Sequence, residues 1–484
     1  MAAFDTDKYL NEQEKCLMER VNKYSKLYLE FGGKLLRDNH ASRVLPGYDP
    51  KCKISLLENM KDKIEIIICI SQQYILKQKY NSDTNFTYQE NVLQMIDELK
   101  QKDILVNSVV ITRITKPNAE QIYMFIKSVE SKGIKVYKHY EIINYVVDID
   151  KTVSEEGYGK NDYIKTNKSL IVVTAPGPSC GKLSTCLSQL YHETLKNNKA
   201  GYAKFETFPV HNLPLDHPVN VAYQAATLDI KDVNAIDYFH LLKYNIHAVN
   251  YNRDIEAFPL LKKLLEKITG KESIYQSPTD MGVNKITCGI INDKECCIAA
   301  KEEIIRRYIK VKHDFNMYGT DEEALLQGKL LMIKMDLNET DLEVVKKTRN
   351  AAFEFNQNVV GVELNHGTNK SVFLSATKTT HLSAASNALM KMFKYFNNIE
   401  EDAHLMIDSI LSNFMELNGR ISRNRNLNCK EVLYALVLSS ENSSYKQSIK
   451  GLDFIKGVHI HSTVKMDIND EKLFKRLGAI VTFD

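Results

Sequence analysis

The distribution of apolar residues predicts a series of short strands separated by helix-length segments. Residues 64–70 (IEIIICI) and 170–174 (LIVVT) are continuous apolar runs, which is typical of strands buried on both faces of a parallel sheet. Residues 7–26 carry apolar side chains at helical spacing, and residues 26–31 then alternate as a strand does. This order predicts an α/β fold with a mainly parallel sheet. Further strands are expected at 106–112, 134–137 and 202–205, with weaker signals at 247–251 and 285–291.

The second half of the chain predicts a helical bridge and then a smaller α/β unit. Residues 302–350 are rich in helix-forming residues and poor in Gly and Pro. Residues 359–364 (VVGVEL) lead through the Gly-containing turn NHGTNK into 371–375 (SVFLS), which predicts a hairpin. The later elements are expected to be helices over 381–396, capped by Thr380, and over 402–416, and strands near 458–464 and 479–483.

These patterns divide the chain into three expected parts. They are an α/β domain with a glycine-rich loop over residues 1–295, a helical bridge over residues 296–350, and a C-terminal α/β subdomain over residues 351–484. A length of 484 residues fits this division, because single domains usually comprise ~100–200 residues.

The composition is that of a globular protein with reduced thiols. The 64 Lys and Arg residues exceed the 61 Asp and Glu residues by only three, which gives no argument for a nucleic-acid or membrane partner. The nine cysteines are scattered and form no CxxC pair, which favours reduced cytosolic thiols over a disulfide scaffold or a zinc ribbon. The acidic start does not resemble a signal peptide, and no apolar run approaches the ~18 residues of a spanning helix. We expect a cytoplasmic protein, and a homo-oligomer remains open.

The segment 169–185 (SLIVVTAPGPSCGKLST) is the strongest indication of a functional site. It reads as a buried strand, a Pro/Gly turn and a Lys at the start of a helix, an arrangement that holds phosphate in many proteins. It departs twice from the pattern G-x-x-x-x-G-K-[ST], because Pro176 and Leu183 replace the first Gly and the magnesium-binding Ser or Thr. The alternative is an ordinary strand-to-helix turn with an exposed lysine. The residues expected to contact a phosphate-bearing cofactor are Ala175, Pro176, Gly177, Pro178, Ser179, Cys180, Gly181, Lys182, Ser184 and Thr185.

Carboxylates in two polar segments could complete such a site. Glu206 follows a predicted strand, and Asp280 lies in the loop-like segment 277–284 (SPTDMGVN). We expect Thr185 or Ser184, with Glu206 or Asp280, to hold magnesium. Lys182, Arg253 and Asp280 are the candidate catalytic residues, with Arg253 offsetting charge on a transferred group. Isolated carboxylates are more often solvated or helix-capping, and that alternative stays open.

Other polar segments give weaker signals. FGGK (31–34), followed by His40 and Arg43, has the composition of a second anion-binding turn, and residues 204–220 contain His211, Asp216 and His217. His459 and His461 share one face of a predicted strand, where His366 or His381 could join them as metal ligands. Neither HExxH nor a deaminase-type zinc motif is present, so we expect no zinc.

Several long segments together resemble one bacterial family. They are LYLEFGGKLLRDNHASRVLPGYDP (27–50), GKNDYIKTNKSLIVVTAPGPSCGK (159–182), GYAKFETFPVHNLPLDHPVN (201–220), VNYNRDIEAFP (249–259) and SPTDMGVN (277–284). The chain is similar over its whole length to the family known as domain of unknown function eighteen-forty-six. The resemblance implies an α/β domain with the glycine loop, a helical insert and a C-terminal α/β subdomain somewhat similar in topology to deaminases. It implies no reaction. The family's loop commonly reads close to TAPGPGSGK, whereas Ser179 and Cys180 stand here.

Two functions remain open from the sequence. The first is a nucleotide- or phosphate-dependent enzyme, using ATP or another phosphate-bearing ligand with magnesium for phosphoryl transfer or hydrolysis. The second is a non-catalytic assembly or regulatory protein whose glycine loop senses an anion or only packs. Binding of ATP or GTP with magnesium would separate them.

Overall fold

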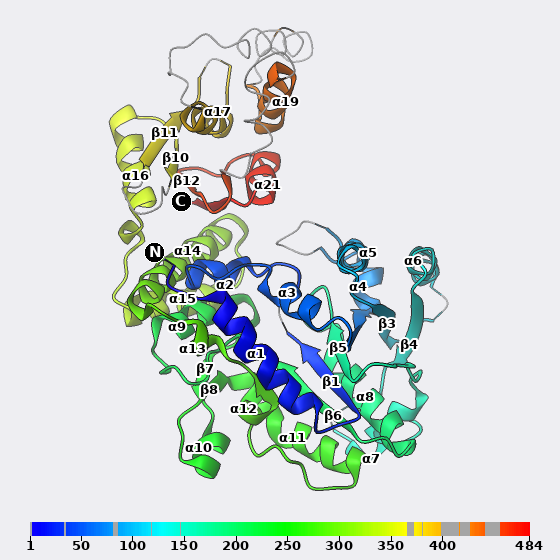
Figure 1. Ribbon diagram of the computed structural model, residues 1–484. Helices are drawn as coiled ribbons and strands as arrows, with labels where there is room; N and C mark the ends of the chain where they lie inside the picture. Colours follow the sequence, from blue (N-terminus) through cyan, green and yellow to red (C-terminus); the bar gives the residue numbers. More distant parts are fainter. Residues whose placement is uncertain are drawn as a thin grey trace. The chain divides into compact units, whose positions relative to one another are not determined.

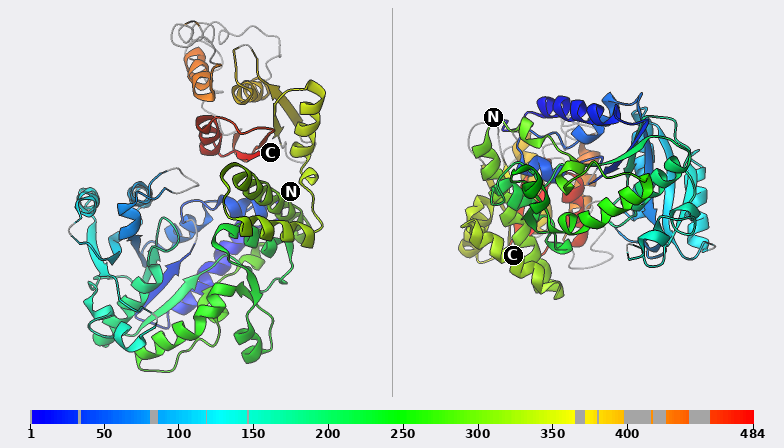
Figure 2. Two further views of the ribbon diagram at one scale, coloured as in Figure 1. Left: turned by 180° about the vertical axis from the view of Figure 1, so that it is seen from behind. Right: turned by 90° about the horizontal axis from the view of Figure 1, so that it is seen from below.

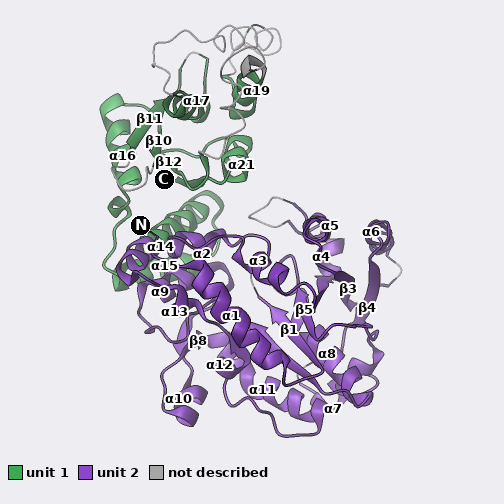
Figure 3. Cartoon of the chain, in the orientation of Figure 1, with its two compact units in different colours: residues 1, 302–484 green, residues 2–301 purple. Residues whose placement is uncertain are grey.

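The chain forms two compact units, residues 2–301 and residues 302–484, in the computed structural model (Figure 3). The structure describes residues 2–32, 35–80, 86–117, 119–145, 147–364, 372–379, 381–397, 416, 426–440 and 455–484.

The N-terminal unit is built on a seven-stranded parallel sheet (Figure 1). Its strand order is β4-β3-β2-β5-β1-β6-β9, so β5 lies between β2 and β1 at the centre. The chain adds β2, β3 and β4 on one side of β5, and then returns to the centre and adds β6 and β9 on the other. The strands are β1 (Lys26–Phe31), β2 (Ile64–Ser71), β3 (Val106–Ile114), β4 (Lys135–Tyr140), β5 (Leu170–Thr174), β6 (Ala200–Phe205) and β9 (Gly282–Val283).

Helices cover both faces of this sheet (Figures 1 and 2). One layer contains α8 (Lys182–Leu195), which packs on β1, β5 and β6, and α11 (Asn252–Thr269), which packs on α8. The other layer contains α1 (Thr6–Val21), α3 (Cys52–Asn59), α5 (Tyr88–Gln101) and α6 (Glu120–Glu130). Shorter helices are α2 (Asn39–Val44), α4 (Gln72–Leu76), α7 (Ile149–Thr152), α9 (Pro218–Ala225), α10 (Tyr238–Tyr244), α12 (Pro278–Met281) and α13 (Ile286–Gly289). A small antiparallel pair joins β7 (Asn234–Ile236) to β8 (Val249–Tyr251).

The two layers explain why the central strands are buried along their whole length. All eight residues of β2 and all five of β5 are buried. Each apolar side chain that is fully buried in this way contributes ~1.5–3 kcal/mol relative to an exposed one. The central strands therefore fix the position of the loops that follow them.

The C-terminal unit contains a helical segment and a four-stranded sheet of order β11-β10-β12-β13. In this sheet β10 is antiparallel to β11 and β12, and β12 is parallel to β13. The unit boundary falls inside α14. The elements are α14 (Asp293–Tyr318), α15 (Glu322–Lys334), α16 (Glu343–Phe355), β10 (Val359–Leu364), β11 (Val372–Thr377), α17 (Ala384–Phe396), α19 (Cys429–Ser440), β12 (His459–Ser462), α21 (Ile468–Arg476) and β13 (Ile480–Phe483).

The structure confirms the α/β class, the parallel sheet, and the hairpin of β10 and β11. The strand expected at 285–291 is wrong, because the Asn284 carboxamide accepts the Ile286 N–H at 3.0 Å and starts the short helix α13. The turn at 365–370, the expected cap Thr380 and, apart from Glu416, the helix expected at 402–416 lie outside the described residues. In the described part of the chain, no helix is long and apolar enough to cross a membrane.

Candidate functional site

The loop between β5 and α8 lies at the carboxyl edge of the main sheet. β5 ends at Thr174 and α8 begins at Lys182, as the sequence predicts for a strand, a turn and a helix start. Gly181 precedes the helix with φ +84°, and no side chain caps the first N–H groups of α8. Ser179 also has a positive φ, +56°. The loop therefore has left-handed backbone at two positions, and its N-cap residue supplies no side chain to the first N–H groups of the helix.

Neighbouring elements hold this loop in place. The Thr112 hydroxyl at the end of β3 donates to the carbonyl of Cys180 at 2.8 Å. A Cβ at Gly181 would lie 2.8 Å from that hydroxyl oxygen, and a Cβ at Gly177 would clash with the hydroxyl of Tyr88 on α5. Both positions require glycine because other side chains occupy the space that a Cβ would need.

Three cations surround the loop. Lys182, Lys79 and Arg113 make no ion pair in the described ranges. Burial raises the pKa of the Cys180 thiol, and the ammonium groups of Lys182 and Lys79 both oppose that rise. Lys79 also lies over the ring of Tyr74, 4.3 Å from its centroid. Positive charge therefore lies near the loop, and the charge of Glu30 on β1 acts on some of the same neighbouring groups.

The two hydroxyls predicted to hold magnesium have different surroundings. Ser184 is half-buried in the first turn of α8. Burial raises the pKa of the nearby Tyr145, and Ser184 and the charge of Arg113 both oppose that rise. Thr185 is fully buried and lies 3.4 Å from the Cys69 thiol of β2, which donates to its hydroxyl. Of the two, only Ser184 lies where a bound ligand can reach it.

Glu206 belongs to a cluster of charges at the carboxyl ends of β1 and β6. Lys204 lies 2.8 Å from Glu206 and 2.6 Å from Asp254 of α11. Glu30 of β1 lies opposite Lys204 of β6 in the strand register. The Glu30 carboxylate accepts a hydrogen bond of 2.9 Å from the Tyr202 hydroxyl. Burial raises the pKa of Glu206, with Lys204 lowering it and Asp254 raising it further. The cluster therefore places a carboxyl group of raised pKa beside other carboxylates.

Strand register connects this cluster with the glycine loop. Glu30 lies opposite Val173 of β5 on one side and opposite Lys204 of β6 on the other. Burial raises the pKa of the Cys186 thiol in α8, the charge of Glu30 raises it further, and Lys182 lowers it. Lys182, Glu30 and Glu206 thus follow one another along the same edge of the sheet. Lys182 and Glu206 are among the residues predicted from the sequence, whereas Glu30 is not.

Arg253 and Asp280 have partners of their own. The Arg253 guanidinium donates to the buried carboxylate of Asp232 at 3.0 Å, although its side chain is largely exposed. Asp280 closes a capping box with Ser277 and accepts a hydrogen bond of 3.0 Å from the Tyr244 hydroxyl. Asp280 precedes β9 rather than following a strand, so it does not lie at the carboxyl end of one.

Comparison with known proteins then decides the family. The family models described as "Domain of unknown function DUF1846, N-terminal" and "Domain of unknown function DUF1846, C-terminal" match residues 2–336 and residues 340–484. The chain belongs to the DUF1846 family. It is also similar to proteins named "UPF0371 protein" from Clostridium botulinum strains Alaska E43 / Type E3 and Loch Maree / Type A3. Each is 47% identical over 492 residues, covering 99% of this chain and 97% of the relative.

Two cations beside the loop of this DUF1846 protein were not found from the sequence. Arg113 has φ +53° next to a break in the register between β3 and β4. Such a bulge redirects the side chain of an otherwise regular strand. Lys79 follows α4, which comes directly after β2. The apolar sequence of β3 reveals neither its bulge nor which strand lies beside it. Only the folded sheet therefore shows that Arg113 and Lys79 lie near the loop.

Several other predicted positions have packing partners or lie outside the described residues. His459 and His461 both bond to the hydroxyl of Thr482, at 3.0 and 2.9 Å, inside the C-terminal unit. His366, Gly33 and Lys34 lie outside the described residues. His40 is buried and meets the ring of Tyr223 edge-on, with 4.6 Å between centroids.

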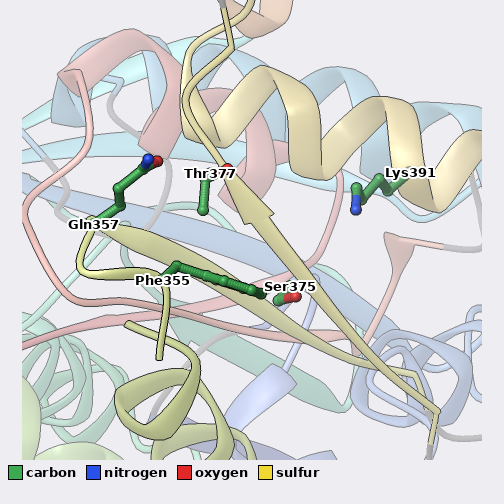
Figure 4. Close-up of a pocket in the computed structure, with 5 residues that line it drawn as sticks. All are labelled: Phe355, Gln357, Ser375, Thr377 and Lys391. Carbon is green, nitrogen blue, oxygen red and sulfur yellow. The ribbon is translucent and has the colours of Figure 1, made fainter. Parts of the chain in front are cut away.

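The C-terminal unit of this DUF1846 protein also has a small hollow of about 240 Å³ (Figure 4). Ser375 and Thr377 lie two residues apart on β11 and therefore share a face. The volume is below the ~300 Å³ of ordinary ligand pockets. The lining has no carboxylate or histidine, so the sheet edge of the N-terminal unit is the better candidate site. The lining residues are Phe355, Gln357, Ser375, Thr377 and Lys391.

Proposed function

We propose that the N-terminal unit binds a small phosphate-bearing ligand at the N-terminus of α8. The observation that carries this proposal is the uncapped helix start surrounded by Lys182, Lys79 and Arg113, which have no ion-pair partner in the described ranges. A dianion placed there gains backbone N–H donors, the positive end of the helix dipole and charge-assisted hydrogen bonds. In the sheet order, the chain leaves β1 toward β2 on one side and leaves β5 toward β6 on the other side. The position at which the connections reverse in this way is where α/β sheets usually bind ligands.

We further propose that this site serves an enzyme that transfers or hydrolyses a phosphoryl group. Burial raises the pKa of Glu206, so its carboxyl group is the candidate to exchange a proton during the reaction. If ATP binds with magnesium, the Ser184 hydroxyl is the group available to the metal, and Glu206 would have to leave Lys204 to join it. Thr185 would first have to leave Cys69, and Arg253 would have to leave Asp232 to reach a transferred group.

Leu183 and the buried Thr185 favour a second function, in which the loop senses an anion without catalysis. The residue after the loop lysine has no hydroxyl, and the next threonine faces the core. A site of this kind holds a phosphate but lacks the usual magnesium ligand. The protein would then act in assembly or regulation, including as a homo-oligomer.

A thermal-shift panel tests the binding proposal. The full chain is melted with ATP, GTP, pyrophosphate and inorganic phosphate, each with and without magnesium. A ligand at 100 times its dissociation constant should stabilise the folded chain by about 2.7 kcal/mol. Release of phosphate from ATP then separates the enzyme from the sensor. No shift with any of the four compounds at millimolar concentration would contradict phosphate binding.

A further inference from the structure

We propose that His217, Asp293 and Cys297 bind a zinc ion in the N-terminal unit. Asp293 and Cys297 lie four residues apart at the start of α14, so both side chains project from the same face of the helix. His217 precedes α9 as its N-cap residue. One ligand atom from each residue lies within 4.8 Å of the other two. These three residues are called the His–Asp–Cys trio below.

The separations fit a shared tetrahedral cation. His217 Nε2 lies 3.3 Å from Asp293 Oδ2 and 3.6 Å from Cys297 Sγ, and Cys297 Sγ lies 3.8 Å from the same Asp293 Oδ2. Bonds of about 2.0 Å to nitrogen and oxygen and about 2.3 Å to sulfur give tetrahedral edges of about 3.3 and 3.5 Å. The His–Asp separation is also longer than the ~2.7–2.9 Å of a charge-assisted hydrogen bond.

The donor set selects the class of cation. Zinc binds thiolate, imidazole and carboxylate together, whereas magnesium and calcium prefer oxygen ligands alone. Three protein ligands leave a fourth position for water. The Val219 N–H now donates to His217 Nδ1 at 3.3 Å, which leaves the ring proton on Nε2. Zinc at Nε2 moves the ring proton to Nδ1 and ends that long contact.

The trio differs from the paired histidines considered in the sequence. The expectation of no zinc rests on His459 and His461 and on the absence of zinc motifs. His217 and Asp293 are 76 residues apart, and only folding brings the start of α14 to the start of α9. The inference is independent of the phosphate site, because no residue of the trio belongs to that site.

Zinc titration of the purified full chain tests the proposal. The chain is stripped with a chelator, reduced, and titrated with zinc against a chromophoric competitor. Wild type should bind one equivalent with high affinity. Asp293→Asn and Cys297→Ser should each weaken zinc binding by about 10–100-fold or more. Loss of a residue that only supports a metal ligand already weakens binding by this factor. Asp293 is largely exposed, so its variant should fold normally.

Matched variants and cobalt make the outcome specific. Glu295→Gln removes a neighbouring exposed carboxylate, and Cys288→Ser removes a thiol outside the trio. Both should bind zinc as wild type does. Cobalt should give a sulfur-to-metal absorption band in wild type and none in Cys297→Ser. Less than one equivalent bound by wild type, or equal zinc affinity for wild type and Cys297→Ser, would overturn the proposal.

Discussion

Ser179 is the non-glycine residue of the β5–α8 loop that adopts a left-handed backbone, with φ +56°. A side chain in that region costs ~1–2 kcal/mol per residue relative to ordinary backbone, and glycine avoids this cost. The resemblance to a family in which the loop commonly has Gly at this position gives the same indication. Strain at Ser179 therefore opposes the folded loop.

Ser179→Gly should raise the free energy of unfolding by about 1 kcal/mol, because it removes this strain. Urea denaturation of the two proteins measures the change. Ser128→Gly is the control, because Ser128 lies inside α6 and glycine there should destabilise by ~0.5–1 kcal/mol. Lower stability of Ser179→Gly than of wild type would show that the hydroxyl matters more than the backbone.

At the scale of elements, a buried ion pair joins α2 to α3. Asp38, the N-cap of α2, lies 2.6 Å from the ammonium of the buried Lys53 in α3. Burial opposes ionisation of Asp38, but Lys53 and the Ala41 N–H outweigh it and lower the pKa of Asp38 to about 2. Because the folded pKa lies below the usual 3.8, the pair stabilises the fold above pH 4. That stabilisation is lost as the pH falls from about 4 to about 2.

Asp38→Asn should flatten the acid dependence of stability. Wild type should lose about 1 kcal/mol from this pair between pH 6 and pH 3, half of the total of about 2 kcal/mol. The variant should lack this loss, although it is less stable at pH 6 because Lys53 stays buried without its partner. Urea midpoints at both pH values measure it. Asp62→Asn, at an exposed position, should lose as much stability between pH 6 and pH 3 as wild type does. An equal loss in Asp38→Asn would refute the assignment of this acid dependence to Asp38.

The elements also show how much the sequence predicts. The apolar run before Ala175 and the helical spacing after Lys182 predict the strand, the loop and the helix start correctly, because both signals are local. The position of Arg113 depends on a bulge against β4, which a single strand does not encode. Asp280 lies in a segment that reads as a loop, but its capping box starts α12 and β9 follows it. Side chains that meet across the sheet edge become visible only in the folded chain.

At the scale of the whole molecule, the two units have separate hydrophobic cores. One core contains buried residues between Leu17 and Val283, and the other contains residues between Val360 and Phe483. The family models divide the chain between 336 and 340, after α15. A unit of ~300 residues is large enough to bury a core of its own.

A fragment of residues 1–336 should therefore unfold cooperatively without the rest of the chain. Calorimetry of the fragment and of the full chain measures this, and one transition of the full chain should coincide with that of the fragment. The fragment 340–484 serves for comparison. A fragment 1–336 without a cooperative transition would show that its folding depends on residues 340–484.

The most direct test of phosphate binding at α8 is isothermal titration with ATP and magnesium. Lys182→Ala should weaken binding about tenfold or more, because a hydrogen bond to a charged group contributes ~1.5–3 kcal/mol and 1.4 kcal/mol is tenfold. Lys182→Arg should restore only part of the affinity. Lys23→Ala, at an exposed position before β1 and hence at the opposite edge of the sheet, should bind as wild type does. Equal affinity of wild type and Lys182→Ala, or no binding by wild type at millimolar ATP, would contradict the account.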